Sequence, residues 1–385
     1  HKMKKLLFIL LTLNLTIIQG YTQTWNVKSI PDSLKKNADA VIRTSSVTYN
    51  RTSIKNSTIT IREVITVLHE EGANAAQLVI HYNQNSKVTE FKGFVYNEHG
   101  NLIRKISKKK DLNDYANSSG LFSDDRVKQY KYSTNTYPYT VEYIYTVDQS
   151  EFLGIPTWKP HQWYDIAVQK ATLTFRTLPS LDINYRELNH EFHLSKGLRG
   201  GKKYYRWNVS NLKAISYEKL SPDYLDIFPS VFLAPNEMSY EGSTGNFNTW
   251  KGLGKWNYDL VKNRDEISEE TLNELKKLTE GISDKKEKVK TVYQYMQGKT
   301  RYVYVGLGIG GYQPTLANEV DSKGYGDCKG LSNYTKSLLK AVGIHSEYVI
   351  IGNGQRRIKF KDFSSPYQMN HAILCVPMEK DTTWL

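Results

Sequence analysis

The sequence predicts two consecutive domains of different class, an all-β sandwich followed by an α+β domain. The first observation is length, because 385 residues exceed what one hydrophobic core normally supports. The second is a run of short segments from Trp25 to about Leu253 in which apolar and polar residues alternate. The third is a change to helical spacing near residue 255. We therefore expect domains at 24–253 and 254–385, with the glycine-containing stretch 241–246 as the connecting region.

The N-terminal half carries repeated short strand signals. Segments with period-two alternation recur between polar turns such as 97–101, and the clearest are Ser57–Ile65, Tyr139–Val147, Ala171–Arg176 and Tyr204–Val209. Strands of this length, each with one apolar face, are typical of antiparallel sheets that pack face to face. We therefore predict a β-sandwich.

The C-terminal half begins with helical patterns and ends with strands. Ile267, Leu272, Leu275 and Leu278 follow helical spacing, and Asp284 with Glu287 three residues later indicates a second helix start. A strand-like segment (301–305) and a glycine-rich loop (306–311) follow. After them come a helix that follows Cys328 and two further strands, at 347–351 and 371–376. Helices before a sheet are typical of an α+β domain.

The glycine-rich loop is not interpreted as a nucleotide site. Gly306, Gly308 and Gly311 match the spacing of a dinucleotide-binding loop after a strand. Such a site needs a helix to open there, and Tyr312-Gln313-Pro314 follows instead.

Composition and charge exclude several functional classes. The net charge is +13, but the basic residues are dispersed and no nucleic-acid motif accompanies them, so a solvated basic surface is expected rather than nucleic-acid binding. With only Cys328 and Cys375, no disulfide framework carries the fold. The nine histidines show no metal-binding spacing, so we expect neither a metal nor a cofactor.

The first residues predict export. Met3-Lys4-Lys5 precedes an apolar run from Leu6 to Ile18, which a polar exit follows. This order is typical of a secretory signal peptide, which we place at residues 1–23. No later segment reaches about 18 apolar residues, so no integral membrane segment is expected after cleavage. The predicted location is periplasmic or secreted.

Cys328 is the first candidate catalytic residue. It lies in Gly324–Gly330, directly before apolar residues at helical spacing, which places it in the first turn of a helix with Asp327 as N-cap. The positive end of the helix dipole and unpaired backbone amides there favour a thiolate and could hold an oxyanion. A lone cysteine is usually a core residue, and we interpret Cys375 that way. The glycine-rich surroundings of Cys328 favour a nucleophile instead.

His371 is the second candidate. It follows 43 residues later at the head of a strand whose parity places His371, Ile373 and Cys375 on one face. A histidine there could deprotonate Cys328 and protonate the leaving amine. A carboxylate should orient it, and the hairpin turn at 377–381 pairs His371 with a position just beyond Leu385. Asp381 and Asp362 are the alternatives.

These motifs carry a family resemblance. The C-terminal half resembles the transglutaminase-like superfamily, which has the papain-type fold. The stretches that carry the resemblance are Gly326-Asp327-Cys328-Lys329 before an amphipathic helix, Asn370-His371-Ala372-Ile373-Leu374, and the Trp384-Leu385 strand. Gly310–Pro314 and the strand-rich half resemble exported bacterial proteins in which a β-sandwich of unknown function precedes this core.

The resemblance implies a cysteine enzyme with a Cys-His-Asp triad. Cys328 and His371 match two members, and the acid is expected just past Leu385, so that the domain would be truncated at its C-terminal end. The implied reaction is acyl transfer on peptide or side-chain amides, by a peptidase, deamidase or transamidase with a protein or peptide substrate. Gln313 is a candidate oxyanion donor from the loop. A non-catalytic binding or scaffold protein that retains this fold is the alternative.

Overall fold

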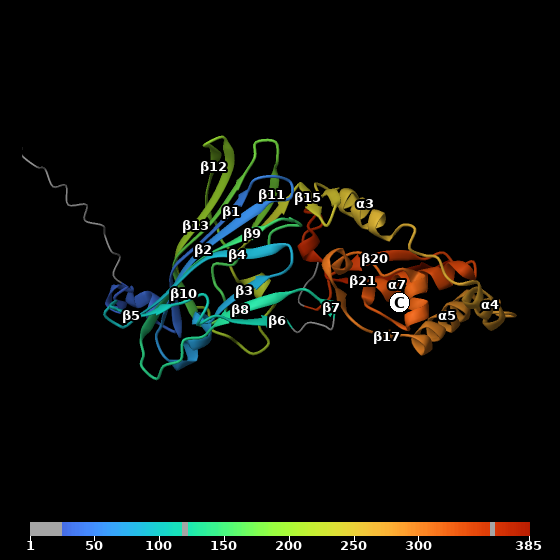
Figure 1. Cartoon of the computed structure of the whole chain (residues 1–385), viewed down its shortest axis with the longest axis horizontal. Coiled ribbons are helices and arrows are strands. Elements are labelled where there is room, and N and C mark those ends of the chain that lie inside the picture. Colours follow the sequence, from blue (N-terminus) through green and yellow to red (C-terminus); the bar gives the residue numbers. More distant parts are fainter. Residues whose placement is uncertain (1–24, 118–121, 355–358) are drawn as a thin grey trace, which may run out of the picture.

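The computed structural model describes residues 25–117, 122–354 and 359–385. They form a strand-rich N-terminal domain and a C-terminal domain that carries the longer helices (Figure 1). This arrangement confirms the predicted fold class. The predicted signal peptide, residues 1–23, lies outside the described residues. Within the described part of the chain, no helix is both long enough and apolar enough to cross a membrane.

A large sheet forms the first layer of the N-terminal domain. Its strands, in spatial order, are β12 (His193–Arg199), β13 (Lys202–Leu212), β10 (Ile166–Thr177), β1 (Ala40–Arg51), β2 (Ser57–Val67), β9 (Tyr139–Gln149), β4 (Ser86–Tyr96) and β5 (Leu102–Ile106). Most neighbours are antiparallel, but β1 and β10 run parallel. The prediction of purely antiparallel sheets is wrong at this pair. The long excursion through β2, β4, β5 and β9 lets the chain return beside β1 in the same direction.

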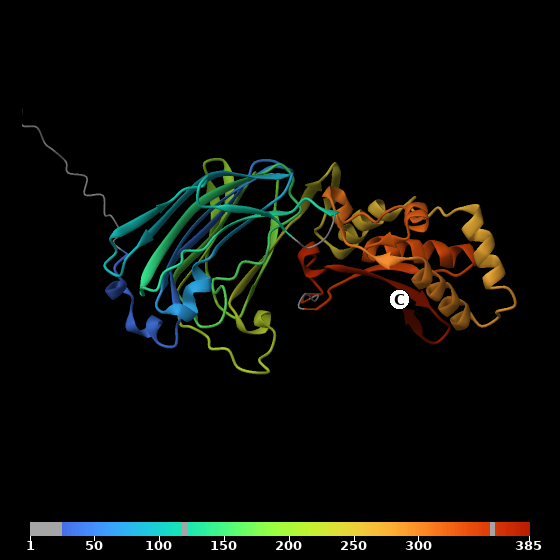
Figure 2. The same cartoon turned by 60° about the horizontal axis from the view of Figure 1, so that its bottom comes forward.

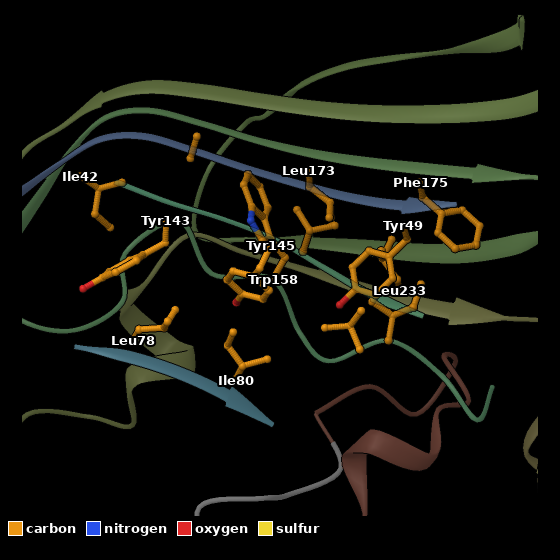
Figure 3. Packing of buried hydrophobic residues seen from close by; sticks show 14 of the residues in the cluster. Ile42, Tyr49, Leu78, Ile80, Tyr143, Tyr145, Trp158, Leu173, Phe175 and Leu233 are labelled. Atoms are coloured by element: carbon orange, nitrogen blue, oxygen red, sulfur yellow. The ribbon is translucent and has the colours of Figure 1, made fainter. Parts of the chain in front are cut away.

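Shorter strands form the second layer and close the core. They are β3 (Leu78–Tyr82), β8 (Arg126–Tyr130) and β6 (Asn113–Ala116) in one group, and β11 (Ile183–Leu188) with β14 (Ser230–Pro235) in another. Figure 3 shows Leu78 and Ile80 of β3 pointing toward Tyr143 and Tyr145 of the large sheet. These side chains are buried because alternate residues of each strand face the opposite layer. The predicted sandwich is therefore confirmed.

Short elements connect the layers and lead to the C-terminal domain. They are η1 (Val27–Ser29), α1 (Asp32–Lys35), η2 (Glu70–Ala76), β7 (Phe122–Ser123), α2 (Tyr224–Ile227), β15 (Glu237–Tyr240) and β16 (Ser243–Asn246). β15 and β16 form an antiparallel hairpin in the predicted connecting region.

Helix α3 (Trp250–Val261) was not predicted. Thr249 caps it, because its Oγ1 accepts a hydrogen bond from the backbone of Gly252 at 3.1 Å. Leu253, Trp256 and Leu260 pack into the core of the N-terminal domain. Gly252 and Gly254 weaken the helical signal of this segment, which explains why the first helix was expected near Ile267. The predicted domain boundary, between residues 253 and 254, falls inside α3. The position of the boundary itself stays a prediction.

The C-terminal domain packs its helices on a small antiparallel sheet. The helices are α4 (Glu269–Leu278), α5 (Lys285–Lys299), α6 (Ala317–Lys323) and α7 (Cys328–Ala341), with short η3 (Gly308–Gly311) and η4 (Pro366–Gln368). The sheet has the order β20 (Glu347–Ile351), β21 (His371–Pro377) and β22 (Thr382–Trp384). In Figure 2 the red strands of this sheet run beneath the orange and yellow helices. The predicted helix start at Asp284 is confirmed, since its Oδ1 accepts from the Glu287 backbone at 2.8 Å.

The two domains meet through a parallel strand pair. β7 pairs with β18 (Val305–Gly306), and the Phe122 ring stacks on Tyr325 with 6.0 Å between centroids. β17 (Arg301–Tyr302) pairs instead with β19 (Tyr325–Gly326). The expected strand 301–305 is therefore divided, because its two ends have different partners. Figure 1 shows β7 at the junction of the two domains.

Candidate active site

Cys328 is the first residue of α7, and the cap in front of it is as predicted. Asp327 Oδ1 accepts hydrogen bonds from the backbone N–H groups of Lys329 and Gly330, each at 3.0 Å. The Cys328 side chain is half-buried at the positive end of the helix dipole. The cap uses two of the unpaired amides that were expected at this helix end, those of Lys329 and Gly330. The cap does not use the N–H of Cys328 itself.

Asp327 also neutralises a buried cation. Its Oδ2 pairs with the Lys329 ammonium, and the two residues are 1% and 7% exposed. The Lys329 ammonium also donates to the Val305 carbonyl at 3.4 Å, which ties α7 to β18. Both charges are therefore held inside the fold, and Asp327 caps the helix that begins with Cys328.

His371 is the first residue of β21, the central strand of its sheet. The predicted parity is confirmed, since Ala372, Leu374 and Val376 are buried while His371 is only partly so. Asn370 fixes the entry into the strand. Its backbone donates to Ile351 at 3.0 Å, and its side chain accepts from the Asn353 backbone at 2.7 Å.

The structure brings Cys328 and His371 to the same cavity. Both line a cavity of about 370 Å³ between the two domains. Ser332, one turn beyond Cys328, donates to the Ala372 carbonyl at 3.3 Å and so links α7 to the strand that presents His371. Two residues far apart in the sequence thus line one cavity, which is a requirement for a nucleophile and its base.

Gln313 has a different placement. Its backbone N–H donates to the Ile309 carbonyl at 2.8 Å. Its neighbour Tyr312 lines the cavity, whereas Gln313 is not among the described residues that do so. Its role as an oxyanion donor stays a prediction.

The alternative orienting acids lie elsewhere. Asp362 forms an ion pair with Arg186 at 2.8 Å. Among the described residues that line the cavity, neither Asp362 nor Asp381 is present. The acid expected past Leu385 stays a prediction. Within the same described part of the chain, no group of three His, Cys, Asp or Glu side chains is arranged to hold a metal ion.

Tyr302 is a site residue that sequence reasoning missed. It lines the cavity together with Cys328. Burial raises the pKa of Tyr302, and the negative charge of Cys328 raises it further. The pairing of β17 with β19 places it there, since Tyr302 lies opposite Gly326 and the Val303 N–H donates to the Gly326 carbonyl at 2.9 Å. The alternation of Tyr302 and Tyr304 was the only signal in the sequence.

A second tyrosine lies near Cys328 on the inner side. Tyr348 of β20 is opposite Leu374, on the face of the sheet that is buried against α7. Burial raises the pKa of Tyr348 well above its usual range, and the charges of Cys328 and Asp327 add to this shift. Its buried hydroxyl has no hydrogen-bond partner among the described residues. Tyr302 thus lines the cavity, whereas Tyr348 is not among its described lining residues, although the charge of Cys328 raises the pKa of both.

The N-terminal domain supplies the opposite wall of the cavity. Asn83, Asp124 and Asp125 line it together with Cys328 and His371. Sequence reasoning missed both aspartates. They lie about two hundred residues before Cys328 and belong to no motif.

The C-terminal domain packs a helix that begins with a cysteine against an antiparallel sheet that presents a histidine. Residues 274–385 match the family model of the transglutaminase-like superfamily. Residues 55–216 match a domain of unknown function, DUF3857. The chain thus joins a DUF3857 domain to a transglutaminase-like core, and its C-terminal domain belongs to that superfamily.

One solved structure supports the fold. A structure described as a "putative protease" from Parabacteroides distasonis aligns with 90% of this chain and 67% of that chain, at 13% identity and a TM-score of 0.68. A "putative cysteine protease" from Cytophaga hutchinsonii aligns with 88% of this chain and 78% of that chain, at 9% identity. Its TM-score of 0.24 is too low to support an argument. No curated protein sequence matches the chain.

Proposed function

We propose that this protein is an exported cysteine enzyme that transfers acyl groups from peptide or side-chain amides. One observation carries the proposal: Cys328 at the start of α7 and His371 at the start of β21 line one cavity. Membership of the transglutaminase-like superfamily supports a cysteine nucleophile. The signal-peptide pattern at residues 1–23 supports export to the periplasm or the medium.

The first half of the reaction forms a thioester. His371 takes the thiol proton, and the Cys328 sulfur attacks the amide carbon to give a tetrahedral intermediate. The backbone N–H of Cys328, which the Asp327 cap does not use, and the hydroxyl of Tyr302, which lines the cavity with Cys328, are the donors that we assign to the oxyanion. The C–N bond then breaks, and His371 returns the proton to the leaving amine.

The second half releases the acyl group. Water or an amine attacks the thioester carbon, His371 takes the proton of this nucleophile, and the C–S bond breaks. The sulfur regains a proton from His371. Water gives a carboxylic acid, as in a peptidase or deamidase, while an amine gives a new amide, as in a transamidase.

The test compares Cys328→Ala with Cys375→Ala, a matched change at the other free cysteine. Three assays separate the reactions: hydrolysis of fluorescent casein, ammonia release from a glutamine peptide, and incorporation of dansylcadaverine. We expect Cys328→Ala to abolish turnover in whichever assay is positive, and Cys375→Ala to retain it.

Two outcomes would overturn the proposal. Equal turnover by Cys328→Ala and the unaltered protein would remove Cys328 as the nucleophile. No turnover in any assay, although iodoacetamide modifies Cys328 in the folded protein, would favour the non-catalytic scaffold.

A further inference from the structure

The two aspartates on the N-terminal wall are held in place on both sides. Ser123, directly before them, pairs with Gly306 of β18. Arg126, directly after them, opens β8 and pairs with Tyr82 of β3. Asp124 and Asp125 thus bridge from a strand bound to the C-terminal domain to a strand of the sandwich, so the fold sets their position at the cavity.

The carboxylates of this wall have no ion-pair partner within the described residues. Asp124 Oδ2 accepts a hydrogen bond from the Gln84 backbone at 3.3 Å, and neither aspartate forms a salt bridge in that part of the chain. The cations close in sequence are engaged elsewhere, because Arg126 and Lys128 both pair with Asp114. Lys329, which also lines the cavity, is neutralised by Asp327. The wall therefore adds negative charge to the cavity.

Aromatic rings connect this wall to the cysteine. Tyr304 lines the cavity together with the two aspartates and Cys328. Burial raises the pKa of Tyr304, and the charges of four nearby residues raise it further: Asp125, Asp327, Cys328 and Asp124. Tyr240, Trp256 and Tyr312 also line the cavity, and the Tyr312 ring lies 5.5 Å from that of Tyr240 and 5.8 Å from that of Trp256. Aromatic faces beside carboxylates are the surroundings that an ammonium or guanidinium group prefers.

We propose that the DUF3857 domain sets the substrate preference of the site, with Asp124 and Asp125 binding a lysine or arginine side chain of a peptide whose acyl carbon meets Cys328. A cavity of about 370 Å³ is large enough for a side chain next to the reacting amide. The inference deepens the proposed function and rests on it for the reaction, but its charge preference can be measured without turnover.

The first experiment measures the field at the cysteine. In the Cys375→Ala background, Cys328 is labelled with two methanethiosulfonates of similar size, one carrying trimethylammonium and one carrying sulfonate. We expect Asp124→Asn with Asp125→Asn to lower the cation-to-anion ratio of labelling rates about tenfold at low ionic strength. Salt should reduce the difference. Glu90→Gln, an exposed acid of β4 in the same domain, is the matched control and should leave the ratio unchanged.

The second experiment measures substrate choice. Peptides that differ only in lysine, norleucine or glutamate beside the amide are compared by kcat/KM, and we expect the lysine preference to be lost in the double variant, mainly through KM. A labelling ratio that the double variant leaves unchanged overturns the inference whatever the turnover assays show. Turnover that depends on Cys328 but shows no preference for lysine also overturns the inference about the aspartates. That result would still support the proposed function. A changed ratio without turnover supports the acidic wall and counts against the proposed reaction.

Discussion

The two walls of the cavity are built in different ways. On the transglutaminase-like wall, Cys328 and His371 are each the first residue of a regular element, and their immediate neighbours Asp327 and Asn370 hold them. On the DUF3857 wall, Asp124 and Asp125 reach the cavity because β7 pairs with a strand far along the chain. The reactive groups thus depend on local structure, while the acidic wall depends on how the domains dock.

The walls also differ in how their charges are balanced. Asp327 and Lys329 form a buried pair beside the cysteine. Asp124 and Asp125 have no such partner within the described residues. A buried pair rigidifies its surroundings, whereas an unpaired carboxylate on a cavity wall is free to attract a ligand. This contrast implies that substitutions on the first wall change chemistry or stability, and that substitutions on the second change selection.

The largest expected effect tests the reactive wall. His371→Gln removes the base and should lower kcat/KM about 10²–10⁴-fold in the positive assay. His345→Gln is the control, because His345 is exposed in the same domain and pairs only with the nearby Glu347 among the described residues. Undiminished turnover in His371→Gln would mean that the reactive wall has been wrongly assigned.

The second effect tests the buried pair. Asp327→Ala removes the cap and leaves the Lys329 ammonium buried without its partner, so the C-terminal domain should lose about 3–5 kcal/mol of its free energy of unfolding. Asp284→Ala removes the exposed N-cap of α5 and should cost about 1 kcal/mol. Urea unfolding measures both. Equal losses would contradict the importance of the buried pair.

The third effect separates the two tyrosines. Tyr302→Phe removes a hydroxyl from the cavity that Cys328 lines, and we expect kcat to fall about tenfold or more with little change in KM. Tyr348→Phe removes a buried hydroxyl without a partner in the described residues, so turnover and stability should change little. A loss of the same size in both variants would show that the position of Tyr302 on the cavity lining is not what matters.

The smallest effect belongs to the DUF3857 domain. Burial lowers the pKa of His161 below its ordinary value of 6.5; its Nε2–H donates to the Lys213 carbonyl at 3.0 Å, while Nδ1 has no partner in the described residues. The unfolded state therefore binds more protons, and stability should fall as pH drops through 6.5 until the folded-state pKa is reached. A melting temperature measured from neutral to mildly acidic pH should show this slope. His161→Gln should flatten it, while the exposed His193→Gln should not.

The sequence alone determined the features that depend on near neighbours. Four such features were predicted and are confirmed. They are the start of α7 at Cys328, its cap at Asp327, the cap at Asp284 and the parity of β21. Caps and strand parity involve residues within a few positions of each other, so a single sequence contains the information. Helix α3 was missed because glycines and a junction location hide its pattern, although its packing against the sandwich stabilises it.

Tertiary structure decided the rest. Strand pairs between distant segments decide three features of the molecule. They are the parallel pair β1–β10, the position of Tyr302 beside Cys328, and the approach of Asp124 and Asp125 to the cavity. β7, β17, β18 and β19 are only two residues long each, and so short a strand has no period that could reveal its partner. The local sequence therefore specifies the reactive pair, while the docking of two domains specifies what surrounds it.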